Sequence, residues 1–441
     1  MGLAGPLLAA GRMVRTSLRV YSLIFLAAGL LFVAGERRLL GWIDLASAAA
    51  GYAPLCACGP SLWLGLTGSL MAVITLLAWR LSRDPEAGAL WDALLLSKGV
   101  SSALFLAFAI HNRHPVFLGA AAVDGLILVH LALLRALADR QRPVLEARAA
   151  RPAGCFHEVW FARVNDAATS RAFWARYSVT QGPGGQRAAC WGVFFDGKNG
   201  ASHIRTWTGA AAFAADGWSF RMDGSGIGPG KLEGAGAGTL WQLSWRPGPC
   251  PVFAMVPAWL RALGLSRSGY ENAAPLARFS GWAELDGRRW SFDEGAGSVG
   301  HVWSERFGGG WWWAHAILGE GEEAVVVELL SAQGRFGPRI TSVCLWRSGR
   351  LHESTGPLRL LLNRSWRVAD EWHFRARAGG VSLDGVCAPG LAASLAYEDG
   401  AGRRLTCRNS KLSRFRLRLR ENGREEVFET RSAAVEFVEP T

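Results

Sequence analysis

The stretch 61–79, SLWLGLTGSLMAVITLLAW, contains no charged residue and is followed directly by Arg80. A helix of about 20 apolar residues is long enough to cross the hydrocarbon core of a bilayer. The stretch therefore predicts a transmembrane helix. Three further apolar stretches complete a predicted four-span transmembrane domain over residues 1–140; they are 20–34, 90–110 and 116–134.

Arginines are unevenly distributed between the two sides of such a four-span domain. If all four stretches cross, ten arginines between Arg12 and Arg151 fall on one side, and Arg37, Arg38 and Arg113 fall on the other. Cytoplasmic loops carry the excess of basic residues. We therefore predict an integral membrane protein whose two termini, and whatever follows the fourth span, are cytoplasmic.

Ionisable residues interrupt two of the predicted spans. Asp92 and Lys98 lie in the third, and Asp124 and His130 lie in the fourth. Such groups are costly in lipid, so they mark either a transport or catalytic pathway or a buried pair between helices. Pairing of Lys98 with Asp124 is one structural alternative, and a functional role of these four membrane-embedded polar residues is the other.

Short motifs in this half are similar to those of a known family. LTGSLMAVITLLAW, SKGVSS and VDG make the segment resemble a family of small four-helix bacterial membrane proteins of unassigned function. The resemblance implies the inner (cytoplasmic) membrane of a bacterial-type cell. It implies no activity.

Composition changes sharply after residue 150, because 17 of the 21 Trp residues lie beyond it. The charged, Pro-punctuated stretch 141–154 is interpreted as a linker. From 155 to 441, short alternating apolar runs such as HEVWFARVND and CWGVFFDG recur between Gly-rich turns. This pattern is typical of antiparallel hairpins. We predict an all-β domain over 155–441, either two antiparallel barrels or one large closed sheet.

Several classes of function are excluded by motif and charge. The net charge of +12 divides into +5 for residues 1–150 (13 basic, 8 acidic) and +7 for the rest (35 basic, 28 acidic), so neither part is strongly basic. No nucleic-acid, metal or cofactor motif is present, and none of these ligands is expected. The cysteines of the β domain are predicted to be free thiols in a reducing compartment; they are Cys155, Cys190, Cys250, Cys344, Cys387 and Cys407.

The segment 295–316, GAGSVGHVWSERFGGGWWWAHA, is the densest group of chemically capable residues. His301 and Trp303 alternate along one predicted strand, and Trp313 and His315 along the next, so each pair shares a face. If the GGG turn forms a hairpin, the four side chains line one wall of a cavity. There an imidazole would donate a proton and an indole would stabilise a carbocation. Alternatively, they only fill a barrel interior.

Longer motifs of the β domain resemble those of a second family. HEVWFARVNDAATSRAFWARYSV, GHVW, WWWAH and TCRNSKLSRFRLRLRENG are similar to the tocopherol cyclase-like and carotenoid 1,2-hydratase (hydroxyneurosporene synthase) group. The resemblance implies a pair of lipocalin-like barrels with a long apolar cavity for an isoprenoid or another lipid. It also implies protonation of a carbon–carbon double bond, followed by capture with water or a phenol.

Carried onto this chain, the His-x-Trp of that group matches His301 and Trp303, and its early Trp matches Trp160. We assign the cavity lining to tryptophans on the predicted strands: Trp160, Trp174, Trp303 and Trp313. A clear Tyr-x-Asp partner is absent, so a glutamate would have to donate the proton. Glu305 is the expected donor beside His301 and His315, with Glu323 and Glu328 as alternatives.

Two other features of the β domain are ambiguous. Glu158 shares the strand face of Trp160 if the strand is regular, but a surface position is preferred. Arg414, Arg416, Arg418 and Arg420 alternate with apolar residues and form one basic strand face. That face either contacts anionic lipid or is simply solvated.

Three functions fit these observations. The first is a membrane-anchored hydratase, cyclase or isomerase acting on an isoprenoid or related lipid. The second is a non-catalytic carrier or sensor that holds a lipid in the same cavity. The third, ranked last, is a transporter formed by the helices and regulated by the β domain. A proton donor facing the cavity beside His301 distinguishes the first from the second.

Overall fold

The computed structural model describes most of the chain. It covers residues 4–34, 36–52, 62–83, 88–113, 115–140, 144–148, 155–213, 218–262, 265–305, 307–319, 323–333 and 338–440. The chain divides into two compact units. One contains Met1–Pro143 and Ala258–Ser266, and the other contains Val144–Pro257 and Arg267–Thr441.

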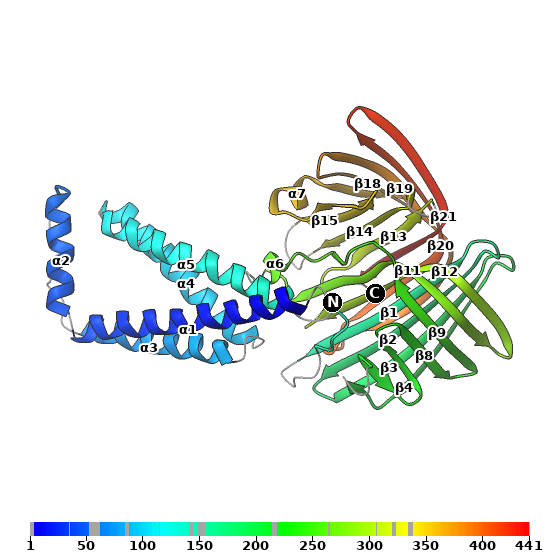
Figure 1. The fold of residues 1–441 in the computed structure, drawn as a ribbon, viewed down its shortest axis with the longest axis horizontal. Coiled ribbons are helices and arrows are strands. Elements are labelled where there is room, and N and C mark those ends of the chain that lie inside the picture. The colour runs from blue at the N-terminus through cyan, green and yellow to red at the C-terminus, as the bar shows by residue number, and fades with distance from the viewer. Residues whose placement is uncertain are drawn as a thin grey trace. The chain divides into compact units, whose positions relative to one another are not determined.

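The first unit is helical. Its helices are α1 (Ala4–Ala34), α2 (Glu36–Ala49), α3 (Leu62–Arg83), α4 (Gly88–Asn112), α5 (Pro115–Arg140) and the short α6 (Ala258–Ala262). Helices α1 and α3 pack side by side, as do α4 and α5. Helix α2 runs across the direction of α1 and α3 (Figure 1).

Three described segments are long and apolar enough to cross a bilayer: Met13–Leu31, Leu90–His111 and Pro115–Ala138. They correspond to three of the four predicted spans. The remaining prediction, 61–79, falls on α3, but residue 61 and the side chains of 62–66 lie outside the described part of the chain.

Each of the four polar residues predicted within the spans has a partner. Lys98 Nζ and Asp124 Oδ1 are 2.9 Å apart in the interior of the helical unit, and Ser101 donates to the other oxygen of Asp124. Asp92 pairs with Arg135 at 2.6 Å, and Tyr21 OH lies 2.7 Å from His130 Nδ1. The pairing of Lys98 with Asp124 is the structural alternative that the sequence analysis raised.

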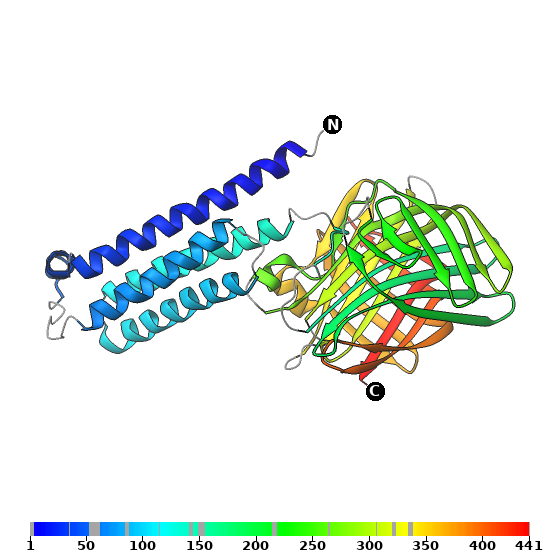
Figure 2. The ribbon, with the colours of Figure 1, turned by 90° about the horizontal axis from the view of Figure 1, so that it is seen from below.

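The second unit consists of two antiparallel sheets, which we call sheet A and sheet B. In the described residues sheet A has twelve strands, in the order β4-β3-β2-β1-β12-β11-β9-β8-β7-β6-β5 with β10 beside β11, and sheet B has nine, in the order β16-β15-β14-β13-β21-β20-β19-β18-β17. Figure 1 and Figure 2 show the two sheets from two directions, with sheet A coloured teal to yellow-green and sheet B yellow to red.

The strands of sheet A are β1 (Phe156–Asp166), β2 (Arg171–Gly182), β3 (Gly185–Asp196), β4 (Ala201–Gly209), β5 (Ala212–Phe213), β6 (Phe220–Met222), β7 (Ser225–Gly228), β8 (Lys231–Gly236), β9 (Thr239–Pro247), β10 (Phe253–Ala254), β11 (Ser268–Leu285) and β12 (Arg288–Ser304). Those of sheet B are β13 (Trp311–Leu318), β14 (Val325–Gln333), β15 (Arg339–Arg347), β16 (Arg350–Ser354), β17 (Arg364–Val368), β18 (Glu371–Ala378), β19 (Val381–Glu398), β20 (Arg404–Glu421) and β21 (Arg424–Pro440), with helix α7 (Pro357–Leu362) between β16 and β17.

Each sheet is curled, and side-chain hydrogen bonds join one end strand to strands near the opposite end. In sheet A, Trp207 of β4 donates its indole N–H to Ser225 Oγ of β7 at 3.3 Å. In sheet B, Ser365 of β17 is hydrogen-bonded to Ser331 at 2.7 Å and to Thr341 at 2.9 Å. Of the two predicted alternatives, the described residues form two curled antiparallel sheets rather than one large closed sheet.

Side-chain alternation gives the β unit three apolar layers. One core lies inside sheet A around Trp160 and Trp241, and a second lies inside sheet B around Trp372 and Phe415. A third, including Trp313, lies between the sheets. The cysteines of this unit are free, and all except Cys155 are buried; Cys56 and Cys58 lie outside the described residues.

We predict that Lys98→Met destabilises the helical unit by about 3–5 kcal/mol, because it leaves the Asp124 carboxylate buried without a cation. Thermal unfolding in detergent measures the effect. The double variant Lys98→Met/Asp124→Asn should recover most of the loss. Asp92→Asn is the control, since that carboxylate is 48% exposed and its ion pair contributes less than about 1 kcal/mol. Equal losses in the single and double Lys98 variants would contradict the prediction.

Candidate functional site

A carboxylate and an imidazole are buried together inside sheet A. Glu158 on β1 and His301 on β12 are both fully inaccessible to solvent, and Oε1 of Glu158 lies 2.7 Å from Nε2 of His301. The antiparallel register places Trp160 opposite His301, and Glu158 opposite Trp303. All four side chains therefore share the inner face of the sheet. We call Glu158 and His301 the dyad.

Indole rings flank the dyad. The ring of Trp160 stacks on that of His301 with centroids 5.0 Å apart and an interplanar angle of 10°, and Trp303 lies at 5.0 Å on a tilted plane. Gly269 on β11 faces Trp303, and a Cβ atom there would come within 2.1 Å of the indole. A glycine at 269 thus leaves the space that the Trp303 ring occupies.

Residues 144–148 lie against the dyad and form a strap over it. The Val144 carbonyl is 2.5 Å from His301 Nδ1, and the Leu145 carbonyl accepts the indole N–H of Trp160 at 3.0 Å. The backbone N–H of Arg148 donates to Glu158 Oε1 at 2.7 Å, and its guanidinium lies 5.0 Å from the centroid of Trp303. Part of the predicted linker is therefore a component of the site.

The partners of His301 determine where the protons lie. A carbonyl oxygen only accepts hydrogen bonds, so Nδ1 carries the hydrogen that points at Val144. Nε2 and the Glu158 carboxyl then share one further proton across 2.7 Å. In either arrangement, imidazolium with carboxylate or imidazole with carboxylic acid, the dyad holds one transferable proton. It can therefore act as a Brønsted acid.

The structure corrects two expectations about this site. Glu158, for which a surface position was preferred, is fully buried. Glu305, the expected donor, is 46% exposed and pairs with Arg267 at 2.7 Å. Glu158 occupies the place beside His301 that was expected for Glu305, because the strand is regular and keeps position 158 on the face of Trp160.

The predicted hairpin that would join His301 and His315 in one wall is also wrong. Strand β12 pairs with β1 and β11, whereas β13 pairs with β14 and β21. The Gly-rich segment after Ser304 is a crossover between the sheets. Trp313 and His315 do share a face, with ring centroids 6.3 Å apart, but they lie in the layer between the sheets.

That layer holds a second buried polar centre, around Glu328 of β14. One carboxylate oxygen accepts the indole N–H of Trp313 at 2.7 Å and the hydroxyl of Tyr270, and the other accepts the amide of Asn272 at 2.9 Å. Burial raises the pKa of Glu328 from 4.5 to about 7, although these hydrogen bonds act in the opposite direction. Glu328, an alternative donor in the sequence analysis, is therefore protonated below about pH 7, but it lies away from the face of His301.

Two buried cations complete the layer. Arg163 Nη2 lies 2.6 Å from His315 Nδ1, and burial together with this guanidinium lowers the pKa of His315 well below its ordinary value. Lys411 pairs with Glu436 at 2.7 Å and lies 4.9 Å from the ring centroid of Trp174. His315 is thus neutral, and Trp174 and Trp313 pack against Lys411 rather than beside the dyad.

The space around the dyad is occupied by aromatic side chains. Phe213 and Phe220 lie 6.5 and 5.4 Å from the ring of Trp160, centroid to centroid. Of the predicted lining, Trp160 and Trp303 therefore border the dyad. Within the described residues, no group of three or more His, Cys, Asp or Glu side chains is arranged to hold a metal ion.

Comparison with known proteins gives distant relatives. No protein-family model matches the chain. Uncharacterized proteins from two strains of Mycobacterium tuberculosis, H37Rv and CDC 1551, are each 27% identical over 273 residues, which is 59% of this chain and 80% of theirs.

Two solved structures show distant structural similarity to this chain. They are kievitone hydratase from Nectria haematococca (TM-score 0.45, 10% identity, 68% of this chain and 93% of that one) and CghA (TM-score 0.44, 10% identity, 68% and 97%). At this level of similarity, neither assigns an activity to this chain.

We predict that the Glu328 carboxyl makes stability fall as pH rises. Its folded pKa near 7 exceeds the unfolded value of 4.5, so the folded state binds the extra proton between these values and loses that advantage on going to higher pH. The contribution is about 3 kcal/mol, spread over this window.

Urea unfolding of wild type and Glu328→Gln, at about pH 5 and about pH 8, tests this window. The wild type should lose more stability than the variant between the two pH values. Because both proteins keep the buried histidines His157 and His315, whose lowered pKa values act in the opposite direction, the difference isolates Glu328. Identical slopes in the two proteins would contradict the assignment.

Proposed function

We propose that this protein is a membrane-anchored enzyme that protonates a carbon–carbon double bond in an isoprenoid or related lipid, as a hydratase, cyclase or isomerase. The observation that carries the proposal is the Glu158–His301 dyad, a proton-holding pair between two indole rings inside a curled sheet. The resemblance of the β domain to the tocopherol cyclase-like and carotenoid hydratase group supports the same chemistry. The three long apolar helices support anchoring.

In the proposed reaction the shared proton of the dyad passes to one carbon of the double bond, leaving neutral imidazole and carboxylate. The other carbon becomes cationic, and the negative faces of Trp160 and Trp303, together with the Glu158 carboxylate, stabilise it. Water, or a hydroxyl group of the substrate, then adds to the cation and returns a proton to the dyad. Loss of a proton from a neighbouring carbon gives an isomer instead. In each case the dyad ends as it began.

Access to the dyad requires movement of the strap. Both side chains are fully inaccessible, and the carbonyl of Val144 and the amide of Arg148 contact them directly. We propose that the substrate enters sheet A when residues 144–148 move away, and that their return excludes bulk water from the cation. Exclusion of water strengthens electrostatic stabilisation of the cation and limits side reactions.

We predict that Glu158→Gln lowers conversion by about 100-fold or more, because an amide keeps nearly the same shape but can neither hold nor return the shared proton. The full chain would be produced in a carotenoid-forming bacterial host and purified in mild detergent, and the bound lipids identified by mass spectrometry. Wild type should retain a substrate and product that are isomers or differ by one water. Glu158→Gln should retain only the substrate.

Glu305→Gln is the matched control. It removes an exposed carboxylate just after β12, the strand that carries His301, and it should leave the product ratio unchanged. Thermal unfolding of all three proteins checks that they are equally folded. The same lipids in the same ratio in wild type and Glu158→Gln would refute the enzyme. Ordinary phospholipids in both would instead support a carrier or sensor.

A further inference from the structure

The outer face of sheet B carries a groove of about 380 Å³, and half of its lining residues are arginines. Its lining is Arg375, Ala376 and Arg377 of β18, Ser382, Leu383 and Asp384 of β19, and Arg418 and Arg420 of β20. Four of the eight residues are cationic and one is anionic. The lining therefore carries an excess of positive charge.

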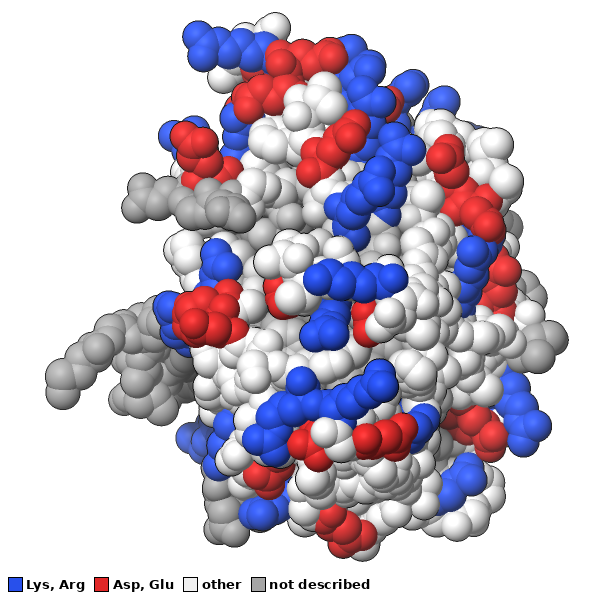
Figure 3. All heavy atoms as spheres, turned by 90° about the vertical axis from the view of Figure 1, so that its right-hand side faces the viewer, with Lys and Arg blue, Asp and Glu red and all other residues white. Residues whose placement is uncertain are grey.

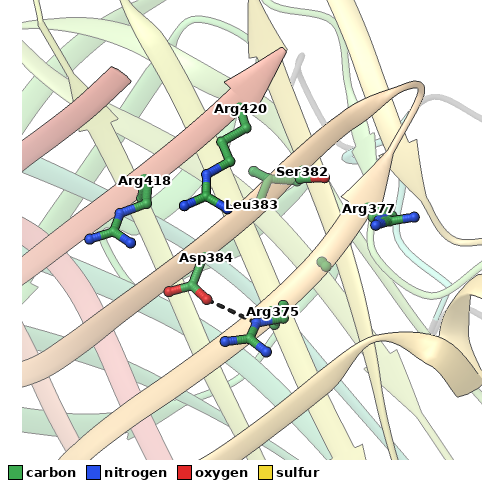
Figure 4. Close-up of a pocket in the computed structure, with 8 residues that line it drawn as sticks. Arg375, Arg377, Ser382, Leu383, Asp384, Arg418 and Arg420 are labelled. Carbon is green, nitrogen blue, oxygen red and sulfur yellow. Dashed lines mark hydrogen bonds and ion pairs between the residues drawn. The ribbon is translucent and has the colours of Figure 1, made fainter. Parts of the chain in front are cut away.

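Strand register explains why the arginines converge. On this face Arg375 lies opposite Asp384, which lies opposite Arg418. In the next row, Arg377 lies opposite Ser382, which lies opposite Arg420. In Figure 4, Arg375, Arg418 and Arg420 gather around Asp384, whereas Arg377 lies to one side. The apolar residues between them point inward, so the arginines cannot fold into the core of sheet B.

The ion pairs of these arginines leave their outer N–H groups available. Arg375 uses Nε to reach Asp384 at 2.9 Å, and Arg418 and Arg420 use Nε to reach the two oxygens of Glu425 at 3.2 and 2.5 Å. A guanidinium has five N–H donors, and four of them are on the Nη atoms. The carboxylates therefore hold the guanidinium planes in place, and the N–H donors on the Nη atoms take no part in these ion pairs.

Each row of the groove keeps one uncompensated positive charge. Asp384 stands between two arginines in one row. In the other, Ser382 stands between Arg377 and Arg420, and Glu425 on β21 lies opposite Arg420. Like charges close together on a sheet face are unfavourable unless an anion lies between them. With two arginines and one carboxylate in each row, the groove keeps positive charge for a further anion beside the Nη donors.

We propose that this groove binds a phosphoryl group, held by Arg375, Arg418 and Arg420. A tetrahedral phosphate has enough oxygen acceptors for several guanidiniums at once, and the planar fork of Arg matches its geometry. Basic and acidic side chains alternate over the face shown in Figure 3, without a broad basic area. The groove, with its eight lining residues, fits one small anionic group, which belongs either to a free phosphate compound or to a lipid headgroup.

Binding of inorganic phosphate and of a short-chain phosphatidic acid to the full chain in neutral detergent tests the proposal. Calorimetry would be run near 0.15 M salt, where long-range attraction is screened beyond about 8 Å. Arg420→Gln should weaken binding about tenfold, the usual effect of losing a charge-assisted hydrogen bond. Arg414→Gln is the matched control: it removes the same charge from the same face of β20, outside the groove lining, and should change binding less than about twofold.

A second pair of variants keeps every arginine. Ser382→Asp places a carboxylate opposite Arg420, within the groove lining, and should abolish binding because it competes with the phosphoryl group, while raising the unfolding temperature. Ser382→Asn, of the same size and neutral, should retain most of the affinity. This comparison separates occupation of the groove from any general effect of charge, and it does not depend on a variant that fails to fold.

The outcomes assign the source of the group or overturn the proposal. Similar affinity for inorganic phosphate and phosphatidic acid assigns a free phosphate compound, and much tighter binding of phosphatidic acid assigns a lipid headgroup. The proposal is overturned if neither probe binds wild type. Equal losses in Arg420→Gln and Arg414→Gln, or wild-type binding by Ser382→Asp, overturn it as well.

Discussion

Arg163 is a cation buried where sheet A meets sheet B, and the packing of the two sheets depends on satisfying it. From β1 its guanidinium reaches His315 on β13, Asn165 on its own strand and the backbone carbonyl of Ser432 on β21. Burial lowers its pKa to about 10, so it remains charged at neutral pH. A buried charge without partners is very costly. The contacts of Arg163 therefore favour one relative placement of the sheets.

Strand β1 connects this layer to the dyad, because its two faces have different roles. Positions 158 and 160 face the interior of sheet A, where Glu158 and Trp160 meet His301. Positions 161 and 163 face sheet B, where Phe161 and Arg163 contact Trp313 and His315. A shift of one residue along β1 would exchange the two sets. The dyad and the layer between the sheets are thus specified by the same register.

Strand periodicity made part of this arrangement predictable from the sequence. It placed His301 with Trp303, and it placed the arginines from 414 to 420 on one exposed strand face. It did not reveal whether the strands on either side of a Gly-rich turn pair with each other, which is why His315 was expected in the wrong layer. Glu158 was detectable as the residue two before Trp160, and Glu328 as a lone carboxylate within an apolar strand. The strap left no signal, because its contacts are made largely by backbone atoms.

The strap has a consequence for how the β unit is delimited. A composition boundary near residue 150 suggests that a fragment starting there is a complete domain, yet the carbonyls of Val144 and Leu145 and the amide of Arg148 are hydrogen-bonded to side chains inside sheet A. Such a fragment would expose His301 and Glu158 and leave the Trp160 indole N–H without its acceptor. The segment that enters the β unit therefore closes part of the interior of sheet A. The β unit begins at this segment, upstream of its first strand.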